Sequence, residues 1–169
     1  TAALPWMTGT SINPLLRALY LCKGGHNVTL MLPFLPLEDQ DAVFPQGLRF
    51  ERPALQEQYV RWWCENRAAV VCPELRIRWY PAKYAPLLGC IIQDTDDITA
   101  IVPPHERDAV ILEEPEHLNW YHHGKVPSPR ERDERSSLDV RAAEHPALEC
   151  LRRQRWNEVY THVVGIAHT

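Results

Sequence analysis

The sequence concentrates its chemically active side chains between Glu113 and Gly124. This stretch reads EEPEHLNWYHHG and holds three carboxylates and three imidazoles within eleven residues. Such groups can act as acids or bases, or can hydrogen-bond to sugar hydroxyls. Trp120 and Tyr121 can stack on a sugar ring, because each joins an apolar face to a polar tip. The alternative is the solvated start of a helix, with glutamates that complement the helix dipole and rings that belong to the core.

No metal site is predicted from the same stretch. His117, His122 and His123 lack the His-Glu-x-x-His spacing of a zinc site. The sequence also contains five widely spaced cysteines, which are Cys22, Cys64, Cys72, Cys90 and Cys150. Because they include no Cys-x-x-Cys pair, they argue against a disulfide framework and a thiolate zinc site, and for a reducing compartment.

A second candidate site is the small-residue turn TGTSINP, which starts at Thr8. Backbone N–H groups at Gly9 and Thr10, together with the dipole of a following helix, can hold a phosphate. The alternative is a plain connection that needs Gly9 for a tight bend. The turn is neither Gly-x-Gly-x-x-Gly nor a Walker loop, so the use of NAD or ATP is not supported.

The elements that must position these groups are short apolar runs that alternate with longer amphipathic stretches. We expect strands over 1–4 (the end of a first strand), 28–32, 48–50, 75–80, 109–112 and 163–167. We expect helices from a cap at Asn13 to Gly24, over 54–67 and over 97–101. This order predicts an α/β fold, with a Rossmann-like parallel sheet and helices on both of its faces.

A third candidate is His168, which follows the last apolar run. A lone histidine in this position is more often structural. A parallel sheet, however, binds ligands at the carboxyl ends of its strands, and all three candidate groups follow expected strands. We therefore expect Thr10, Glu114 and His168 to meet along one edge of the sheet.

The composition is that of an ordinary globular domain, with 169 residues of which 45% are hydrophobic and 24% charged. A formal net charge of −4 argues against nucleic acid as the main partner. No apolar stretch approaches the roughly 20 residues that span a bilayer. Residues 126–154 are rich in arginine, glutamate and aspartate, and we predict a surface insertion there, helical from Pro146 onwards.

Both ends of the sequence indicate a piece of a longer protein. Thr1 is not an initiator methionine, and the chain stops directly after an apolar run. We therefore expect residues 1–169 to form one incomplete domain.

Five segments of the chain resemble the N-terminal region of the digalactosyldiacylglycerol synthases and occur in the same order. They are ALPWMTGTSINPLLRALYL, VTLMLPFLPLEDQ, YVRWW, ILEEPEHLNWYHHGK and VVGIAHT. The phrase EEPEHLNWYHHG is long and unusual, so it is the most specific of these. The chain departs from the family in residues 126–154, where the family continues directly into a segment like Arg155-Trp156, and in having no C-terminal domain.

The resemblance implies the N-terminal, acceptor-side half of a retaining GT-B glycosyltransferase, in which two Rossmann-like domains face each other across a cleft. Such an enzyme transfers galactose from UDP-galactose to monogalactosyldiacylglycerol. It uses no cofactor and works as a peripheral protein of the chloroplast outer envelope membrane. The implied partners are the galactolipid acceptor, the membrane surface and a C-terminal donor-binding domain.

The resemblance also implies roles for individual residues. His168 would be the catalytic residue beside the reacting sugar, and Gly9 and Thr10 would lie near the donor diphosphate. The acceptor contacts would be Glu114, His117, Trp120 and His122. Residues that either meet the membrane or belong to the core are Trp6, Met7, Phe34, Leu35 and Leu37. The alternatives are a non-catalytic membrane- or lipid-binding Rossmann-like module and a GT-B transferase with another acceptor.

Overall fold

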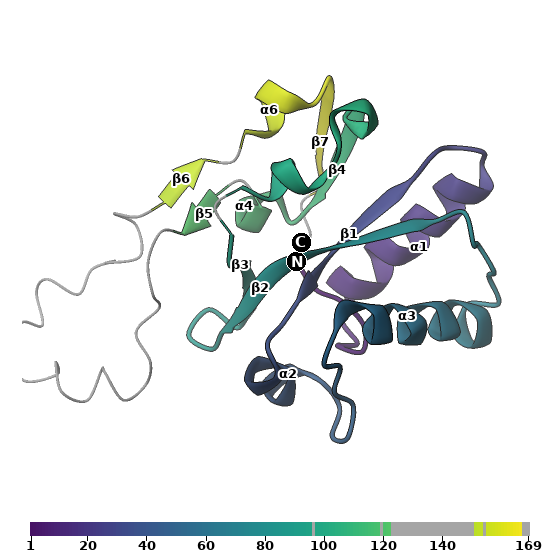
Figure 1. The fold of residues 1–169 in the computed structure, drawn as a ribbon, viewed down its shortest axis with the longest axis vertical. Coiled ribbons are helices and arrows are strands. Elements are labelled where there is room, and N and C mark those ends of the chain that lie inside the picture. Colours follow the sequence, from purple (N-terminus) through teal and green to yellow (C-terminus); the bar gives the residue numbers. More distant parts are fainter. Residues whose placement is uncertain (96, 119, 123–150, 154, 167–169) are drawn as a thin grey trace, which may run out of the picture.

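The computed structural model describes residues 1–95, 97–118, 120–122, 151–153 and 155–166, and its fold is α/β (Figure 1). The strands are β1 (Thr29–Phe34), β2 (Arg76–Ala85), β3 (Cys90–Gln93), β4 (Ala109–Glu113), β5 (Trp120–His122), β6 (Leu151–Arg153) and β7 (His162–Ile166). The helices are α1 (Gly9–Lys23), α2 (Leu37–Val43), α3 (Pro53–Arg67), α4 (Pro115–Leu118) and α6 (Trp156–Val159), with 3-10 helices η1 (Ile98–Ile101) and η2 (Pro104–Glu106). Across the described part of the chain, no helix has the length and apolar character needed to cross a membrane.

The described strands form three separate sheets, two of which contain parallel pairs. β1 pairs in parallel with β2, and β4 pairs in parallel with β7. The predicted α/β class with parallel strands is therefore confirmed. The expectation of a single all-parallel sheet is wrong for the described residues, because β2 and β3, and also β5 and β6, are antiparallel. A short turn joins β2 to β3, and a short turn permits only an antiparallel pair.

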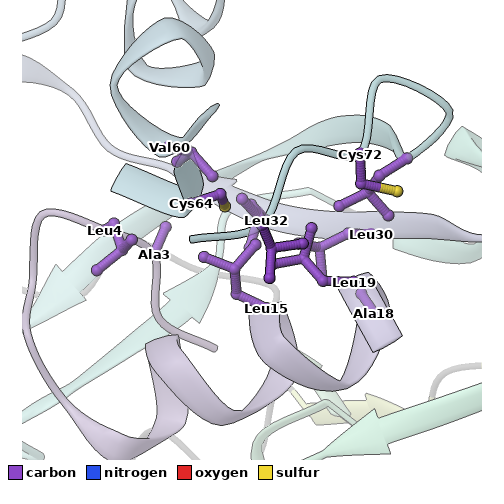
Figure 2. Close-up of a cluster of buried hydrophobic side chains, with 12 residues drawn as sticks. Ala3, Leu4, Leu15, Ala18, Leu19, Leu30, Leu32, Val60, Cys64 and Cys72 are labelled. Carbon is purple, nitrogen blue, oxygen red and sulfur yellow. The ribbon is translucent and has the colours of Figure 1, made fainter. Parts of the chain in front are cut away.

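Both faces of the β1–β2 pair are covered. On one face, Leu15 of α1 and Val60 of α3 join Leu30 of β1 in a buried cluster (Figure 2). Met31, the next residue of β1, packs against a second cluster that includes Trp156 of α6. Successive side chains of a strand point to opposite faces, so this alternation identifies β1 as a strand buried on both sides.

Helix α1 begins earlier than predicted. Its cap is Thr8 rather than Asn13, because the Thr8 backbone is extended and its carbonyl accepts two N–H groups of the first turn, each at 3.1 Å. Pro14 consequently lies inside the helix instead of at its first position, where it removes one helical hydrogen bond. The predicted end of the helix at Gly24 is confirmed.

Two expected strands, 1–4 and 48–50, are absent from the described elements. In the second case the buried side chain of Gln40 takes the place of a strand partner. Its Nε2 donates to the carbonyls of Leu35 and Phe50 at 2.8 and 2.9 Å, and its Oε1 accepts the Phe50 N–H at 2.8 Å. The N–H and C=O groups of Phe50 thereby have hydrogen-bond partners without a neighbouring strand.

The strands expected at 109–112 and 163–167 are present as β4 and β7 but are less buried than predicted. Ile111 is 40% exposed and Val164 is 52% exposed, because no described element covers that side of the pair. Residues 151–153, expected in the helical part of the insertion, instead form β6 because they pair with β5. The rest of the predicted insertion lies outside the described residues.

Glu106 connects the two parallel pairs at the amino ends of their strands. Its carboxylate accepts hydrogen bonds from Thr29 Oγ1 of β1 and from Arg78 of β2, both at 3.0 Å, and its side chain is 11% exposed. Burial alone would raise the pKa of Glu106. The hydrogen bonds from Thr29 and Arg78, with the charges of Arg76 and Arg78, outweigh burial and hold this pKa below its usual range.

Replacing Glu106 with Gln should lower the free energy of unfolding of the full-length protein at pH 7 by about 1–3 kcal/mol. Because the folded state lowers this pKa, the stabilisation is complete above about pH 5 and is lost as the pH falls below the ordinary glutamate pKa of about 4.3 and through the lower folded-state pKa. Urea unfolding at a series of pH values measures both effects. The same change at the exposed Glu51 serves as the control. A Glu106→Gln deficit that persists unchanged at pH 3.5 would contradict the assignment.

Candidate functional site

The turn before α1 presents backbone donors at the start of a fifteen-residue helix. The hydroxyl of Ser11 hydrogen-bonds to the carbonyls of Trp6 and Thr8, which holds the turn in place. Among the described residues, the amide groups of Gly9 and Thr10 have no acceptor. Unpaired amides at a helix start, reinforced by the helix dipole, favour an anion.

Gly9 is not required for a tight bend, and that alternative is wrong. Its backbone lies in the helix, and an added Cβ would have only the amide of Asn13 nearby, at 3.7 Å. The space around Gly9 is thus open.

Glu113 and Glu114 end β4 in different environments. Glu113 is 8% exposed, and its Oε1 lies 2.7 Å from Nε of Arg17 on α1. Glu114 has a φ of 59°, in the left-handed region, which costs a non-glycine residue about 1–3 kcal/mol. Two backbone hydrogen bonds of 3.3 Å hold Glu114 there, one to the carbonyl of Ile166 and one from the N–H of Leu118. This strain marks Glu114 as a candidate functional residue.

The turn before α1 and Glu114 lie beside the same pair of strands. The ring of Trp6, two residues before the helix cap, meets Tyr84 of β2 edge-on, with centroids 6.1 Å apart. On β3, burial raises the pKa of the Cys90 thiol, and the charge of Glu114 raises it further. Trp6, just before the helix cap, contacts β2, and α4, which directly follows Glu114, contacts β3, so both turns lie next to the β2–β3 pair.

We refer to the turn over 8–11, the β2–β3 ladder and the turn over 113–115 together as the rim. Figure 1 shows the amino end of α1 on the side where β1 and β2 end. Burial and the charge of Glu114 raise the pKa of Tyr80, a buried residue of β2 that precedes the β2–β3 ladder. The rim itself combines amide donors and carboxylate acceptors at the end of the strands where α/β folds bind ligands.

Several predicted site residues cannot be placed at the rim by their side chains. His117 lies on α4, and Trp120 and His122 lie on β5, but their side chains are outside the described part of the structure. His168 is outside it entirely. Of the three residues expected to meet along one edge, Thr10 and Glu114 belong to turns of the rim, and His168 is not described. The roles of all the predicted site residues remain predictions.

Residue patterns missed two groups that shape the rim. The first is the Arg17–Glu113 ion pair, whose partners are far apart in sequence. The alternation of β4 could have indicated an inward Glu113, but nothing in the sequence indicates Arg17. The second is Trp156, which is buried and donates from Nε1 to the carbonyl of Leu118 at 2.8 Å. This bond holds the end of α4, directly after the Glu114 turn.

One group of possible metal ligands lies away from the rim. The ligand atoms of Cys22, Cys72 and Glu74 are all within 4.8 Å of one another. Their spacing in the sequence did not indicate a thiolate site, but the fold brings Cys22 and Cys72 together from distant positions. However, a hydrogen bond with Cys72, together with burial, raises the pKa of Cys22 to about 11. The Cys22 thiol is therefore protonated at neutral pH, which disfavours metal binding.

The residues considered for membrane contact divide into two sets. Leu35 is 1% exposed and belongs to the core, and Trp6 and Phe34 are partly buried and pack against it. Met7 and Leu37 are 55% and 37% exposed and stay available for an apolar surface.

The chain is similar over its whole length to digalactosyldiacylglycerol synthases of plants. It is 40% identical to "Digalactosyldiacylglycerol synthase 1, chloroplastic" of Glycine max and covers 18% of that protein. It is 39% identical to synthase 1 of Arabidopsis thaliana, covering 17%, and 38% identical to synthase 2 of Lotus japonicus, covering 30%. The resemblance predicted from the sequence is confirmed, and the chain spans only 17–30% of the length of these relatives. No family model matches the chain.

The turn that carries Glu114 should depend on the absence of a side chain at Gly165. An added Cβ there would lie 3.2 Å from Cγ of Pro115, too close for normal packing. We expect Gly165→Ala to lower the free energy of unfolding of the full-length protein by about 1–3 kcal/mol, measured by urea denaturation. Gly9→Ala is the matched control, and it should change this free energy by less than about 1 kcal/mol because its Cβ would make only an ordinary van der Waals contact with Asn13. Equal effects of the two changes would contradict the close contact.

Proposed function

We propose that this chain is the N-terminal, acceptor-side part of a retaining GT-B glycosyltransferase that makes digalactosyldiacylglycerol. The donor would be UDP-galactose and the acceptor monogalactosyldiacylglycerol. The observation that carries this proposal is the similarity over the whole chain, at 38–40% identity, to proteins named as digalactosyldiacylglycerol synthases. The α/β fold with parallel strand pairs is compatible with a Rossmann-like half of such an enzyme.

The unpaired amides of Gly9 and Thr10 support a place for the donor diphosphate. In galactosyl transfer, UDP leaves as an anion, and the charge that develops on its phosphate must be stabilised. Amide donors at the start of a long helix can do this without a metal ion, because they are fixed in place before the reaction. Most of the uridine contacts would come from a C-terminal domain.

On the acceptor side, Glu114 is the carboxylate best suited to bind sugar hydroxyls. Its neighbour Glu113 is already engaged by Arg17, whereas Glu114 is partly exposed on the rim. We propose His117, Trp120 and His122 as further acceptor contacts. His168 would act as the catalytic residue, hydrogen-bonded to the reacting sugar while the acceptor hydroxyl attacks from the face that UDP leaves.

A lipid acceptor requires contact with a membrane, and exposed apolar side chains near the rim support one. Leu87 and Leu88, in the turn between β2 and β3, are 72% and 64% exposed. Tyr84 lies just before this turn. It contacts the ring of Trp6, which directly precedes Met7, and its N–H donates a 2.8 Å hydrogen bond to Asp39, two residues after Leu37. The relatives are named chloroplastic, and we propose peripheral binding to the chloroplast outer envelope membrane.

His168→Ala in the full-length enzyme should lower transfer from labelled UDP-galactose to monogalactosyldiacylglycerol by at least about a hundredfold, as expected for a group acting at the reaction centre. Glu114→Gln should mainly raise KM for the lipid acceptor, because it removes a binding contact. His105→Ala is the control, since this imidazole is exposed and precedes β4 at the end opposite the rim. Full activity of the His168→Ala variant would show that His168 does not act at the reaction centre.

The same assay separates the alternative functions. Absence of any transfer by the full-length protein, with retained lipid binding, would favour a non-catalytic lipid-binding module. Transfer to a different acceptor would favour another GT-B transferase.

Binding to vesicles should depend on the β2–β3 turn. We expect the double change Leu87→Asp and Leu88→Asp to weaken flotation of the full-length protein with galactolipid vesicles by about tenfold or more, because two apolar side chains would no longer enter the interface. Val71→Asp is the control, because Val71 is 66% exposed but precedes β2 at its opposite end. Equal loss of binding by both variants would show that the turn is not the contact surface.

A further inference from the structure

Two cysteines lie side by side where the end of α1 meets the chain that leads into β2. Cys22 belongs to the last turn of α1, and Cys72 belongs to the connection over 68–75, which joins α3 to β2. Both thiols are free, and their Sγ atoms lie within 4.8 Å of each other and of a carboxylate oxygen of Glu74. A disulfide bond is about 2.05 Å long, so a modest rearrangement of the two side chains separates this pair from a cross-link.

The backbone on both sides of the pair is held in place. At the end of α1, the carbonyl of Cys22 accepts the N–H of Gly25 at 3.0 Å. On the other side, Arg61 of α3 donates to the carbonyls of Cys72 and Leu75 at 3.5 and 2.9 Å. The fold therefore keeps the two sulfurs close together, which gives each thiol a high effective concentration beside the other.

The two thiols differ in their access to solvent. Cys22 is partly exposed, whereas Cys72 is 8% exposed and belongs to the buried cluster between α1 and α3. A reagent in solution therefore reaches Cys22 first. Cys64 is the other thiol of this cluster, but it is 5% exposed, and Figure 2 shows its sulfur apart from that of Cys72. Cys22 is thus the better placed partner for Cys72.

We propose that Cys22 and Cys72 form a thiol–disulfide site, which a low-molecular-weight disulfide such as oxidised glutathione closes to a cross-link between α1 and the connection over 68–75. The Cys22 thiolate attacks oxidised glutathione, the S–S bond of this molecule breaks, and a mixed disulfide forms as one glutathione leaves. Cys72 then attacks Sγ of Cys22, the Sγ–Sγ bond forms, and the second glutathione leaves. Two electrons pass from the cysteines to glutathione, and the two thiol protons end on the two glutathione molecules released.

The surroundings of Cys22 make this exchange slow in both directions. A hydrogen bond with Cys72, together with burial, raises the pKa of Cys22 to about 11, and the charge of Glu74 adds to the rise. Little of Cys22 is therefore thiolate at neutral pH, so the dithiol reacts slowly. A thiol of high pKa is also a poor leaving group, so the closed disulfide is opened slowly. The site therefore responds to a lasting change in the thiol–disulfide balance rather than to a brief one.

The cross-link fastens α1 to the chain that enters the strand beneath it. The loop from Cys22 to Cys72 contains β1, α2 and α3, so closing it restricts a long stretch of the unfolded chain. It also makes separation of the last turn of α1 from the connection over 68–75 rarer. A cavity of about 350 Å³, whose lining includes Leu19, Cys72 and Ile77, lies beside this connection and gives it room to adjust when the bond forms.

Peptide mapping of the full-length protein tests the pair, and its outcome does not depend on galactosyl transfer. The reduced protein is incubated with oxidised glutathione in mildly alkaline buffer, and the remaining thiols are blocked with N-ethylmaleimide. Trypsin then places the neighbouring cysteines on separate peptides over 18–23, 62–67 and 68–76, with Cys22 on the first and Cys72 on the last. We expect the first and last peptides to be joined, and dithiothreitol to separate them. Free or glutathione-bound thiols on both, or a link between 62–67 and 68–76, would overturn the proposal.

Hydrogen exchange of the same protein measures the effect of the cross-link. Amides over 18–24 and 68–75 should exchange about tenfold or more slowly in the oxidised protein than in the reduced protein, because the two segments can no longer separate. Cys22→Ser should abolish this difference. Cys64→Ala is the matched control and should keep it, because Cys64 takes no part in the cross-link. Equal exchange in the oxidised and reduced wild-type protein would contradict the proposed fastening of α1.

Discussion

Two mostly buried carboxylates, one before β4 and one at its end, hold the two parallel strand pairs in their relative positions. Glu106 binds Thr29 and Arg78 at the amino ends of the strands, and Glu113 binds Arg17 at the other end. A mostly buried carboxylate that loses its hydrogen-bond partners costs about 1–3 kcal/mol, so each connection favours the observed positions of the elements that it joins. The rim at the carboxyl ends of the strands depends on this constraint.

The two glutamates at the end of β4 also differ in their contacts, because only Glu113 pairs with Arg17. Glu113 binds Arg17 of α1 and connects the strand to the helix, whereas Glu114 has a left-handed backbone and is partly exposed. Strain of this kind persists only where the surroundings enforce it, and here the close contact of Pro115 with Gly165 and the bonds to neighbouring backbone do so. The packing of β7 against this turn therefore helps to hold the backbone of Glu114 in the left-handed conformation.

In the proposed function, the donor and acceptor would bind at the same end of the described domain, at the turn before α1 and at Glu114. The turn before α1 contacts β2 through Trp6, α4 directly after Glu114 contacts β3, and the exposed Leu87 and Leu88 lie in the turn that joins these two strands. A lipid whose headgroup enters the rim would then keep its chains in the membrane beside the turn. The Trp6–Tyr84 contact links these two regions, since it joins the turn before α1 to the same strand.

Apolar periodicity and a long specific phrase are local properties, so the sequence predicted the α/β class, the family likeness, the two longest helices and the four strands of the parallel pairs. It misplaced the cap of α1, since Thr8 and Asn13 are both good caps and only the fold chooses between them. It did not predict that the side chain of Gln40 would replace a strand at 48–50. Two other features could be seen only in the folded chain. Arg17 meets Glu113, and β1 and β4 line the same cavity. These contacts join segments far apart in the chain, so they depend on the packing of the whole domain.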